Sequence, residues 1–234
     1  MRLALSARER VIVALDYPDA AQALGLIERL NGLVQWFKIG LEIYLYEGNK
    51  FVDKVRSQGH SVFLDLKLHD IPNTVAGAVR SASKAGAEML TVHAAGGPAM
   101  LAAAAEAAAG LPNPPKLLAV TVLTSMDQEH LHGIGIPASP AEQVLRLARI
   151  GWDAGIRGFV SSAEEAAEMR RSLPKATLVI PGIRPAGVAT GDQKRVATPA
   201  AAIAAGADYL VIGRPITEAK DPAAAAAAIL DEIR

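Results

Sequence analysis

Cysteine is missing from this sequence of 234 residues. A chain without cysteine forms no disulfide bond, has no catalytic thiolate and offers no cysteine ligand to a metal. An excess of charge of one sign is missing as well, because 24 basic residues balance 24 acidic ones. This balance provides no basic field for nucleic acid and no acidic tail for a charged partner. We therefore expect no nucleic-acid partner.

Long hydrophobic runs are also missing. No stretch of the sequence approaches the roughly 20 apolar residues that a membrane-spanning helix requires. The N-terminus reads MRLALSARERVIVALD, where a short apolar stretch is soon followed by Arg8, Glu9 and Arg10. This arrangement makes a poor signal peptide. We therefore expect a cytoplasmic protein that has no contact with a membrane.

Hydrophobic residues nevertheless make up 51% of the chain, which is enough to bury a sizeable core. They form short β-rich runs that alternate with longer, alanine-rich helical stretches. Near-continuous apolar runs are typical of parallel strands that are covered on both faces. The predicted strands are Val11–Leu15, Trp36–Ile39, Ser61–Lys67, Met89–His93, Leu117–Thr124, Gly158–Ser161, Thr177–Pro181 and Tyr209–Ile212.

Helical segments separate these strands. Capping residues or prolines mark two helix starts, Asp16 with Pro18 and Ser139 with Pro140. The predicted helices include Pro18–Leu30, Thr74–Ala85, Pro98–Ala108, Pro140–Ala154, Ala163–Ser172 and Thr198–Ala205. Eight strands alternating with helices predict an α/β fold, a (β/α)8 TIM barrel, with residues 1–234 as a single catalytic domain.

Polar residues cluster at the carboxyl ends of the predicted strands. They are Asp16, Lys38, Asp65, Lys67, His93, Thr124, Arg184 and Arg214. In an eight-stranded barrel these ends converge on one face, and that face holds the active site. One such residue could simply be a structural cap, but so many together indicate a functional site.

Asp65, Lys67 and Asp70 form a D-x-K-x-x-D pattern. The first two lie two residues apart on a strand, so their side chains leave the same face. Asp70 lies just beyond, in the loop. The pattern alone allows two interpretations: a salt bridge that holds a loop, or a lysine kept protonated by carboxylates and able to donate a proton. Lys38 and Asp16 extend it into a row of alternating charges.

The second half of the sequence predicts a phosphate site. The segment PGIRPAGVATGDQKR, residues 181–195, follows the seventh predicted strand and contains Arg184, Gln193, Lys194 and Arg195. The eighth strand ends in IGRPIT, where Gly213 and Arg214 lead into a predicted helix. Loops after the seventh and eighth strands, together with a helix N-terminus, form the usual phosphate site of such barrels.

The segment FLDLKLHDIPNTV resembles the signature of the orotidine 5′-phosphate decarboxylase family. The likeness covers nearly the whole chain and is strongest to the bacterial branch. The other matching segments are VALD at 13–16, FKIG at 37–40, VTVLTS at 120–125, PGIR at 181–184, GDQKR at 191–195 and IGRPI at 212–216.

This resemblance implies a carboxy-lyase that converts orotidine 5′-phosphate (OMP) to UMP and carbon dioxide in pyrimidine biosynthesis, without a cofactor or a metal. It implies that Lys67 donates the proton to C6 of the pyrimidine, with Asp65 beside the departing carboxylate. The implied substrate contacts are Asp16 and Lys38 with the ribose, Thr124 with the pyrimidine, and Arg184, Gln193, Gly213 and Arg214 with the phosphate. It also implies a homodimer in which Asp70 and Thr74 reach the partner's site.

Two alternatives remain open at this point. A magnesium-dependent sugar-phosphate decarboxylase or aldolase could share the barrel and the D-x-K-x-x-D pattern. A barrel that binds a phosphate ligand without catalysis could share the phosphate site. The sequence also leaves the roles of His69 and His93 open, although support of Lys67 suits His93 better than proton transfer does.

Overall fold

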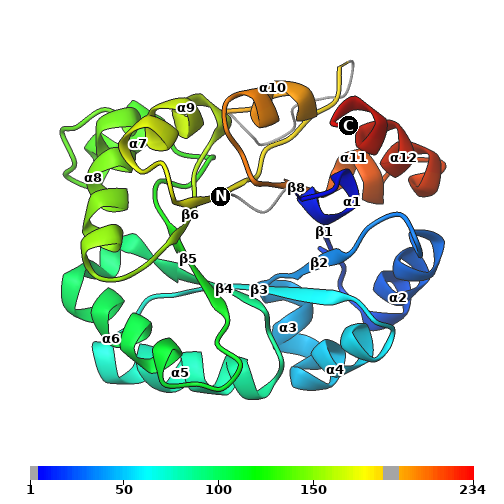
Figure 1. The fold of residues 1–234 in the computed structure, drawn as a ribbon, viewed down its shortest axis with the longest axis horizontal. Helices are drawn as coiled ribbons and strands as arrows, with labels where there is room; N and C mark the ends of the chain where they lie inside the picture. The colour runs from blue at the N-terminus through cyan, green and yellow to red at the C-terminus, as the bar shows by residue number, and fades with distance from the viewer. Residues whose placement is uncertain (1–4, 187–194) are drawn as a thin grey trace.

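The structure, a computed structural model, describes residues 5–186 and 195–234. Eight parallel strands follow one another around a closed barrel, and the first also pairs with the last (Figure 1). They are β1 (Val11–Ala14), β2 (Trp36–Ile39), β3 (Ser61–Leu68), β4 (Met89–His93), β5 (Lys116–Val120), β6 (Gly158–Val160), β7 (Thr177–Ile180) and β8 (Tyr209–Ile212). The predicted (β/α)8 barrel is confirmed.

Helices form an outer ring around the strands (Figure 1). They are α1 (Ala7–Arg10), α2 (Ala20–Arg29), α3 (Leu41–Glu47), α4 (Asn49–Ser57), α5 (Pro72–Lys84), the 3-10 turn η1 (Ala94–Gly96), α6 (Gly97–Ala109), α7 (Gln128–Gly133), α8 (Pro140–Asp153), α9 (Ala163–Ser172), α10 (Pro199–Ala204), α11 (Arg214–Thr217) and α12 (Pro222–Glu232). Within the described residues, no helix is both long and apolar enough to cross a membrane.

The strands are largely apolar on both faces because each face is covered. Side chains alternate along a strand, so one set points toward the helices and the other into the barrel. Val13, Phe37 and Leu64 belong to the large core between strands and helices. The interior of the barrel holds a second, smaller core, which contains Ile12, Ala14, Phe63, Met89, Leu118, Val179, Tyr209 and Val211.

The same alternation makes the interior polar toward the carboxyl ends of the strands. Asp65 follows Phe63 by two residues on β3, and Thr91 follows Met89 by two on β4. Both polar side chains therefore lie on the inward face, one step beyond the apolar interior core. The barrel thus positions polar groups at the end where active sites of this architecture lie.

Two details differ from the prediction. Strand β5 ends at Val120, where its pairing with β6 also ends, so Thr124 lies in the following loop rather than at a strand end. Helix α2 is capped by Asp19, whose side chain accepts a hydrogen bond from the Gln22 backbone N–H, and not by Asp16. Asp16 is therefore not used by that helix. The predicted cap at Ser139 is confirmed, with Glu142 completing a capping box.

Candidate active site

A cavity of about 310 Å³ opens at the carboxyl ends of the strands. Its wall brings together residues of β1, β2, β3, β5, β6 and β8, and residues of the loops that follow β1, β5, β7 and β8. Most of the site residues predicted from the sequence line it: Asp16, Lys38, Asp65, Lys67, Thr124, Arg184, Gly213 and Arg214. Gln193 lies outside the described residues, so its predicted phosphate contact stays a prediction.

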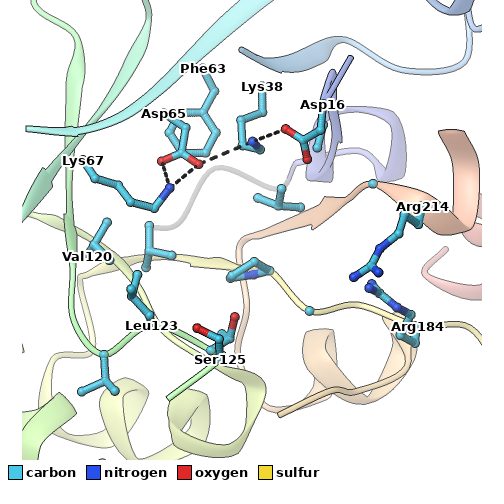
Figure 2. A pocket seen from close by; sticks show the side chains of 18 residues that line it. Asp16, Lys38, Phe63, Asp65, Lys67, Val120, Leu123, Ser125, Arg184 and Arg214 are labelled. Carbon is cyan, nitrogen blue, oxygen red and sulfur yellow. Dashed lines mark hydrogen bonds and ion pairs between the residues drawn. The ribbon is translucent and has the colours of Figure 1, made fainter. Parts of the chain in front are cut away.

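Four charged side chains stand in a row along one wall of the cavity (Figure 2). The Lys67 ammonium donates to both carboxylate oxygens of Asp65, at 2.9 Å each. Lys38 lies 3.5 Å from the other side of that carboxylate and donates to Asp16 at 3.0 Å. The row therefore alternates in sign, with Asp65 between two ammonium groups.

The electrostatics of this row favour its charged form. Burial alone would raise the pKa of the Asp65 carboxyl, but the charges of Lys38 and Lys67, with hydrogen bonds from Lys67 and Thr91, hold that pKa below its usual range. Burial alone would lower the pKa of Lys38, but Asp65 and Asp16 outweigh burial and raise it. At neutral pH Asp65 is therefore an anion and Lys38 a cation.

Two arginines occupy the far end of the cavity. Figure 2 shows the side chains of Arg184 and Arg214 pointing toward one another, well away from Lys67. Arg184 is buried, and one of its guanidinium nitrogens donates to the Ile183 carbonyl at 2.8 Å. Two guanidinium groups that face each other repel, so an anion placed between them is stabilised by both, and a phosphate suits their geometry.

The start of α11 lies at this end of the cavity and has few backbone N–H groups to offer. Gly213 is the residue before the helix, and Pro215 stands within its first turn. Proline has no backbone N–H, and the helix is only four residues long, so few N–H donors face an anion there. Among the described residues, the side chains of Arg184 and Arg214 therefore offer most of the hydrogen-bond donors at this end of the cavity.

Arg195, which closes the predicted phosphate segment, does not line the cavity. Its guanidinium forms a buried ion pair with Glu165 of α9 and donates to the carbonyls of Val122 and Leu123. It therefore connects the end of that segment to α9 and to the loop that carries Thr124.

Asp70 and Thr74 also lie outside this cavity. Both side chains are exposed, and both line a separate hollow of about 320 Å³ on the other side of Lys67. The Asp70 carboxylate accepts a hydrogen bond from the Ile71 backbone N–H at 2.6 Å. Within one chain, Lys67 is the one predicted site residue among those described that lines both this hollow and the cavity.

His69 and His93 stack beside β3, with ring centroids 5.2 Å apart and ring planes 16° apart. The Nδ1 atom of His93 accepts the Ala95 backbone N–H at 3.3 Å, which requires that nitrogen to be unprotonated. Burial, His69 and Lys67 together lower the pKa of His93. His93 is therefore a neutral imidazole that stacks on His69 and does not line the cavity.

A sequence model of the orotidine 5′-phosphate decarboxylase / HUMPS family matches residues 9–229. The chain belongs to this family. Orotidine 5′-phosphate decarboxylase of Halorhodospira halophila is 52% identical over 96% of this chain and 95% of that one. The enzyme of the same name from Nitrosococcus oceani is 50% identical over 97% and 98%. The solved structure of orotidine 5′-phosphate decarboxylase from Lactobacillus acidophilus superposes with a TM-score of 0.85, at 38% identity, over 97% of this chain and 99% of that one.

Next to the charged row lie further residues of this chain that the sequence patterns did not single out. Thr91 is fully buried beside the charged row. Gly40 packs directly against the pair formed by Lys38 and Asp16. A Cβ at this position would lie 3.0 Å from Nζ of Lys38 and 3.1 Å from an oxygen of Asp16, so a side chain here would crowd the pair. Thr91 had one sequence signal: it is a polar residue at an inward-facing position between apolar neighbours of its strand.

Proposed function

We propose that this chain is an orotidine 5′-phosphate decarboxylase, a carboxy-lyase acting as a single barrel domain. The observation that carries the proposal is the position of Asp65, an ionised carboxylate held between Lys38 and Lys67 in a cavity that ends in two arginines. The names and the high identity of the relatives over almost their whole length support it.

The cavity suggests one orientation for OMP. Its phosphate lies between Arg184 and Arg214, near Gly213, with Gln193 as a further contact. Its ribose hydroxyls bond to Asp16 and Lys38, and Thr124 bonds to the edge of the pyrimidine. This orientation brings C6 and its carboxylate to the opposite end of the cavity, where Asp65 and Lys67 lie (Figure 2).

The chemistry follows from the charges at that end. The bond between C6 and the carboxylate breaks, carbon dioxide leaves, and the electron pair stays on C6. The Lys67 ammonium stabilises this developing negative charge and then transfers a proton to C6, which gives UMP. Lys67 afterwards regains its proton from water. Without a cofactor to delocalise the charge, the site must supply stabilisation near the upper end of the enzymatic range, roughly 20 kcal/mol.

Asp65 has two tasks in this scheme. It accepts two hydrogen bonds from the Lys67 ammonium and so fixes the direction from which the proton arrives. Its negative charge also lies beside the substrate carboxylate, and this repulsion is relieved when carbon dioxide departs. The phosphate contacts lie far from C6, so their binding energy can drive closure of the site around the reacting groups.

We further propose a homodimer in which Asp70 and Thr74 complete the site of the partner subunit. The exposure of both side chains, and the exposure of 66% of Ile71 between them, supports this assignment. The cytoplasmic location remains a prediction from the sequence.

An ultraviolet assay of OMP consumption tests the proposal. The purified protein should consume OMP at the same rate with and without EDTA, and the product should be UMP. A rate that falls to background in EDTA and returns with Mg²⁺ would favour a metal-dependent sugar-phosphate enzyme. Binding of UMP without any consumption of OMP would favour a barrel that only binds phosphate ligands. Either result contradicts the proposal.

A further inference from the structure

Strand β3 leaves its regular pairing with β4 at the reacting residues. Leu64 pairs with Leu90 and Leu68 pairs with Val92, so Asp65, Leu66 and Lys67 lie opposite Thr91 alone. A bulge of this kind removes ladder hydrogen bonds and redirects side chains. It lies at the residues to which the proposed function assigns the chemistry.

The bulge places Lys67 in an uncommon backbone conformation. Its φ angle is +48°, and it is the one residue other than glycine with a positive φ among those that the structure describes. The left-handed region costs most residues free energy because Cβ approaches the carbonyl oxygen. Such strain persists only where the surroundings hold it, and it concentrates at functional sites.

A single hydroxyl group holds this bulge. The Thr91 hydroxyl oxygen accepts the Lys67 backbone N–H at 2.8 Å, and the same hydroxyl donates to a carboxylate oxygen of Asp65 at 2.9 Å. A hydroxyl has one proton and two lone pairs, so it can make both bonds at once. Because an ionised carboxylate only accepts, the hydroxyl proton must point to Asp65.

These bonds close a ring through the two reacting residues. Thr91 binds the Asp65 carboxylate, the carboxylate binds the Lys67 ammonium, and the Lys67 backbone returns to Thr91. Thr91 is fully buried and does not line the cavity, so it acts through its neighbours and not by touching substrate. Removal of its hydroxyl leaves a buried N–H unpaired and the carboxylate one donor short.

We propose that Thr91 is a positioning residue for the decarboxylation, whose hydroxyl holds the Asp65 carboxylate and the strained backbone of Lys67 in one fixed arrangement. This inference rests on the proposed function, and it adds a residue of β4, a strand to which that function assigns no role. The phosphate and ribose contacts lie outside the ring that Thr91 closes.

The test compares Thr91→Val, which removes the hydroxyl but keeps the shape, with Thr91→Ser, which keeps the hydroxyl. We expect kcat to fall roughly ten- to a hundredfold in Thr91→Val, with KM and UMP binding within about threefold of wild type. Thr91→Ser should stay within about threefold in all three quantities. If Thr91→Val does not fold, Thr91→Cys replaces it, because a thiol is a weaker hydrogen-bond donor than a hydroxyl. The kcat of Thr91→Cys should then lie below that of Thr91→Ser.

A second readout does not depend on turnover. Loss of a hydrogen bond to the ionised form should raise the pKa of Asp65 in ligand-free Thr91→Val but not in Thr91→Ser, as followed by carbon-13 NMR of the carboxyl. An unchanged kcat in Thr91→Val, or equal losses in the valine and serine variants, would overturn the positioning role. If the wild type does not consume OMP but the pKa of Asp65 still rises in Thr91→Val, the proposed function is overturned and the contact between Thr91 and Asp65 is not.

Discussion

At the scale of single residues, Lys67 is constrained both at its side chain and at its backbone. Its side chain is held by both oxygens of one carboxylate, and its backbone is held in a left-handed conformation. The two hydrogen bonds to Asp65 therefore fix the direction in which the ammonium points. A fixed donor needs little reorganisation when charge develops next to it, and this is how preorganised sites lower a barrier.

Replacement of this lysine should remove most of the activity. We expect Lys67→Ala to lower kcat by at least about a thousandfold, because it removes both the proton donor and the cation beside C6. Binding of UMP should weaken by less than about tenfold, since the arginines remain. Steady-state kinetics and UMP titration measure the two effects. Lys54→Ala, an exposed position on α4, is the matched control. Activity of Lys67→Ala within tenfold of wild type would remove Lys67 from the chemistry.

Asp65 makes part of the folding free energy depend on pH. Its pKa in the folded chain lies below the usual value, which is about 3.9. Its contribution to stability is therefore present above that usual value and is lost as the pH falls toward the folded-state pKa. We expect the free energy of unfolding of wild type to fall relative to Asp65→Asn as the pH drops from about 5 to about 3. Urea unfolding of both proteins measures this, and a constant difference between them would contradict it.

At the scale of elements, α9 connects two loops of the site through one buried ion pair. Glu165 pairs with Arg195, and it also accepts a hydrogen bond from the hydroxyl of Ser162 at the start of the helix. Arg195 in turn donates to the carbonyls of Val122 and Leu123, next to Thr124. The loop proposed to hold the pyrimidine is thus attached to the end of the phosphate segment.

Breaking this pair should destabilise the protein. We expect Glu165→Gln to lower the free energy of unfolding by about 3 to 5 kcal/mol, because it leaves the Arg195 charge buried without its partner. Glu168→Gln on the same helix is the matched control, since Glu168 pairs with Arg171 on the surface. Its effect should stay within about 0.5 kcal/mol. If both variants lower the free energy of unfolding equally in urea, the buried pair stabilises the protein no more than the surface pair does.

The elements were largely predictable, and their ends were not. The run of β8, for example, matched the prediction because apolar residues there fill both faces of a short strand. The run around β5 continues as Thr121–Leu123 after the ladder has ended, and Val122 is still buried. Hydrophobicity alone does not separate a buried loop from a strand. The predicted end at Thr124 was therefore wrong.

In the candidate site, too, some features were predictable from the sequence and others were not. Alternation correctly placed Asp65 and Lys67 on the side of the cavity, and strand ends predicted the partners at β1 and β2. The bulge was not predictable, because the register of β3 is set by its pairing with β4 and leaves no local pattern. The role of Thr91 was not predicted for a related reason. A β-branched residue is common in strands, and the hydroxyl of Thr91 forms its two hydrogen bonds only because the bulge lies opposite.

At the scale of the whole molecule, the barrel gathers charges that are distant in the sequence at one end of its interior. Asp16 and Arg214 are nearly the length of the chain apart, yet both line the same cavity because β1 pairs with β8. Asp70 and Thr74 are the exceptions, since they face a separate hollow. A second subunit would give them a site to complete.

Mixed dimers test this sharing of sites. Lys67→Ala and Asp70→Ala should each be nearly inactive as homodimers. After unfolding and refolding together, we expect about a quarter of the wild-type sites to regain activity, because half of the dimers are mixed and each contains one intact site. Activity of the mixture, compared with either variant refolded alone, measures this. A mixture as inactive as its components would place Asp70 in the site of its own chain.

The central claim is that this site cleaves the carboxylate from OMP and protonates C6. Its most direct test uses OMP labelled with carbon-13 in the carboxylate and follows the reaction by NMR. The account predicts that labelled carbon dioxide and bicarbonate appear at the same rate as the C6–H signal of UMP, with wild type and not with Lys67→Ala. Label that stays in the nucleotide, or equal release by wild type and Lys67→Ala, would contradict the account.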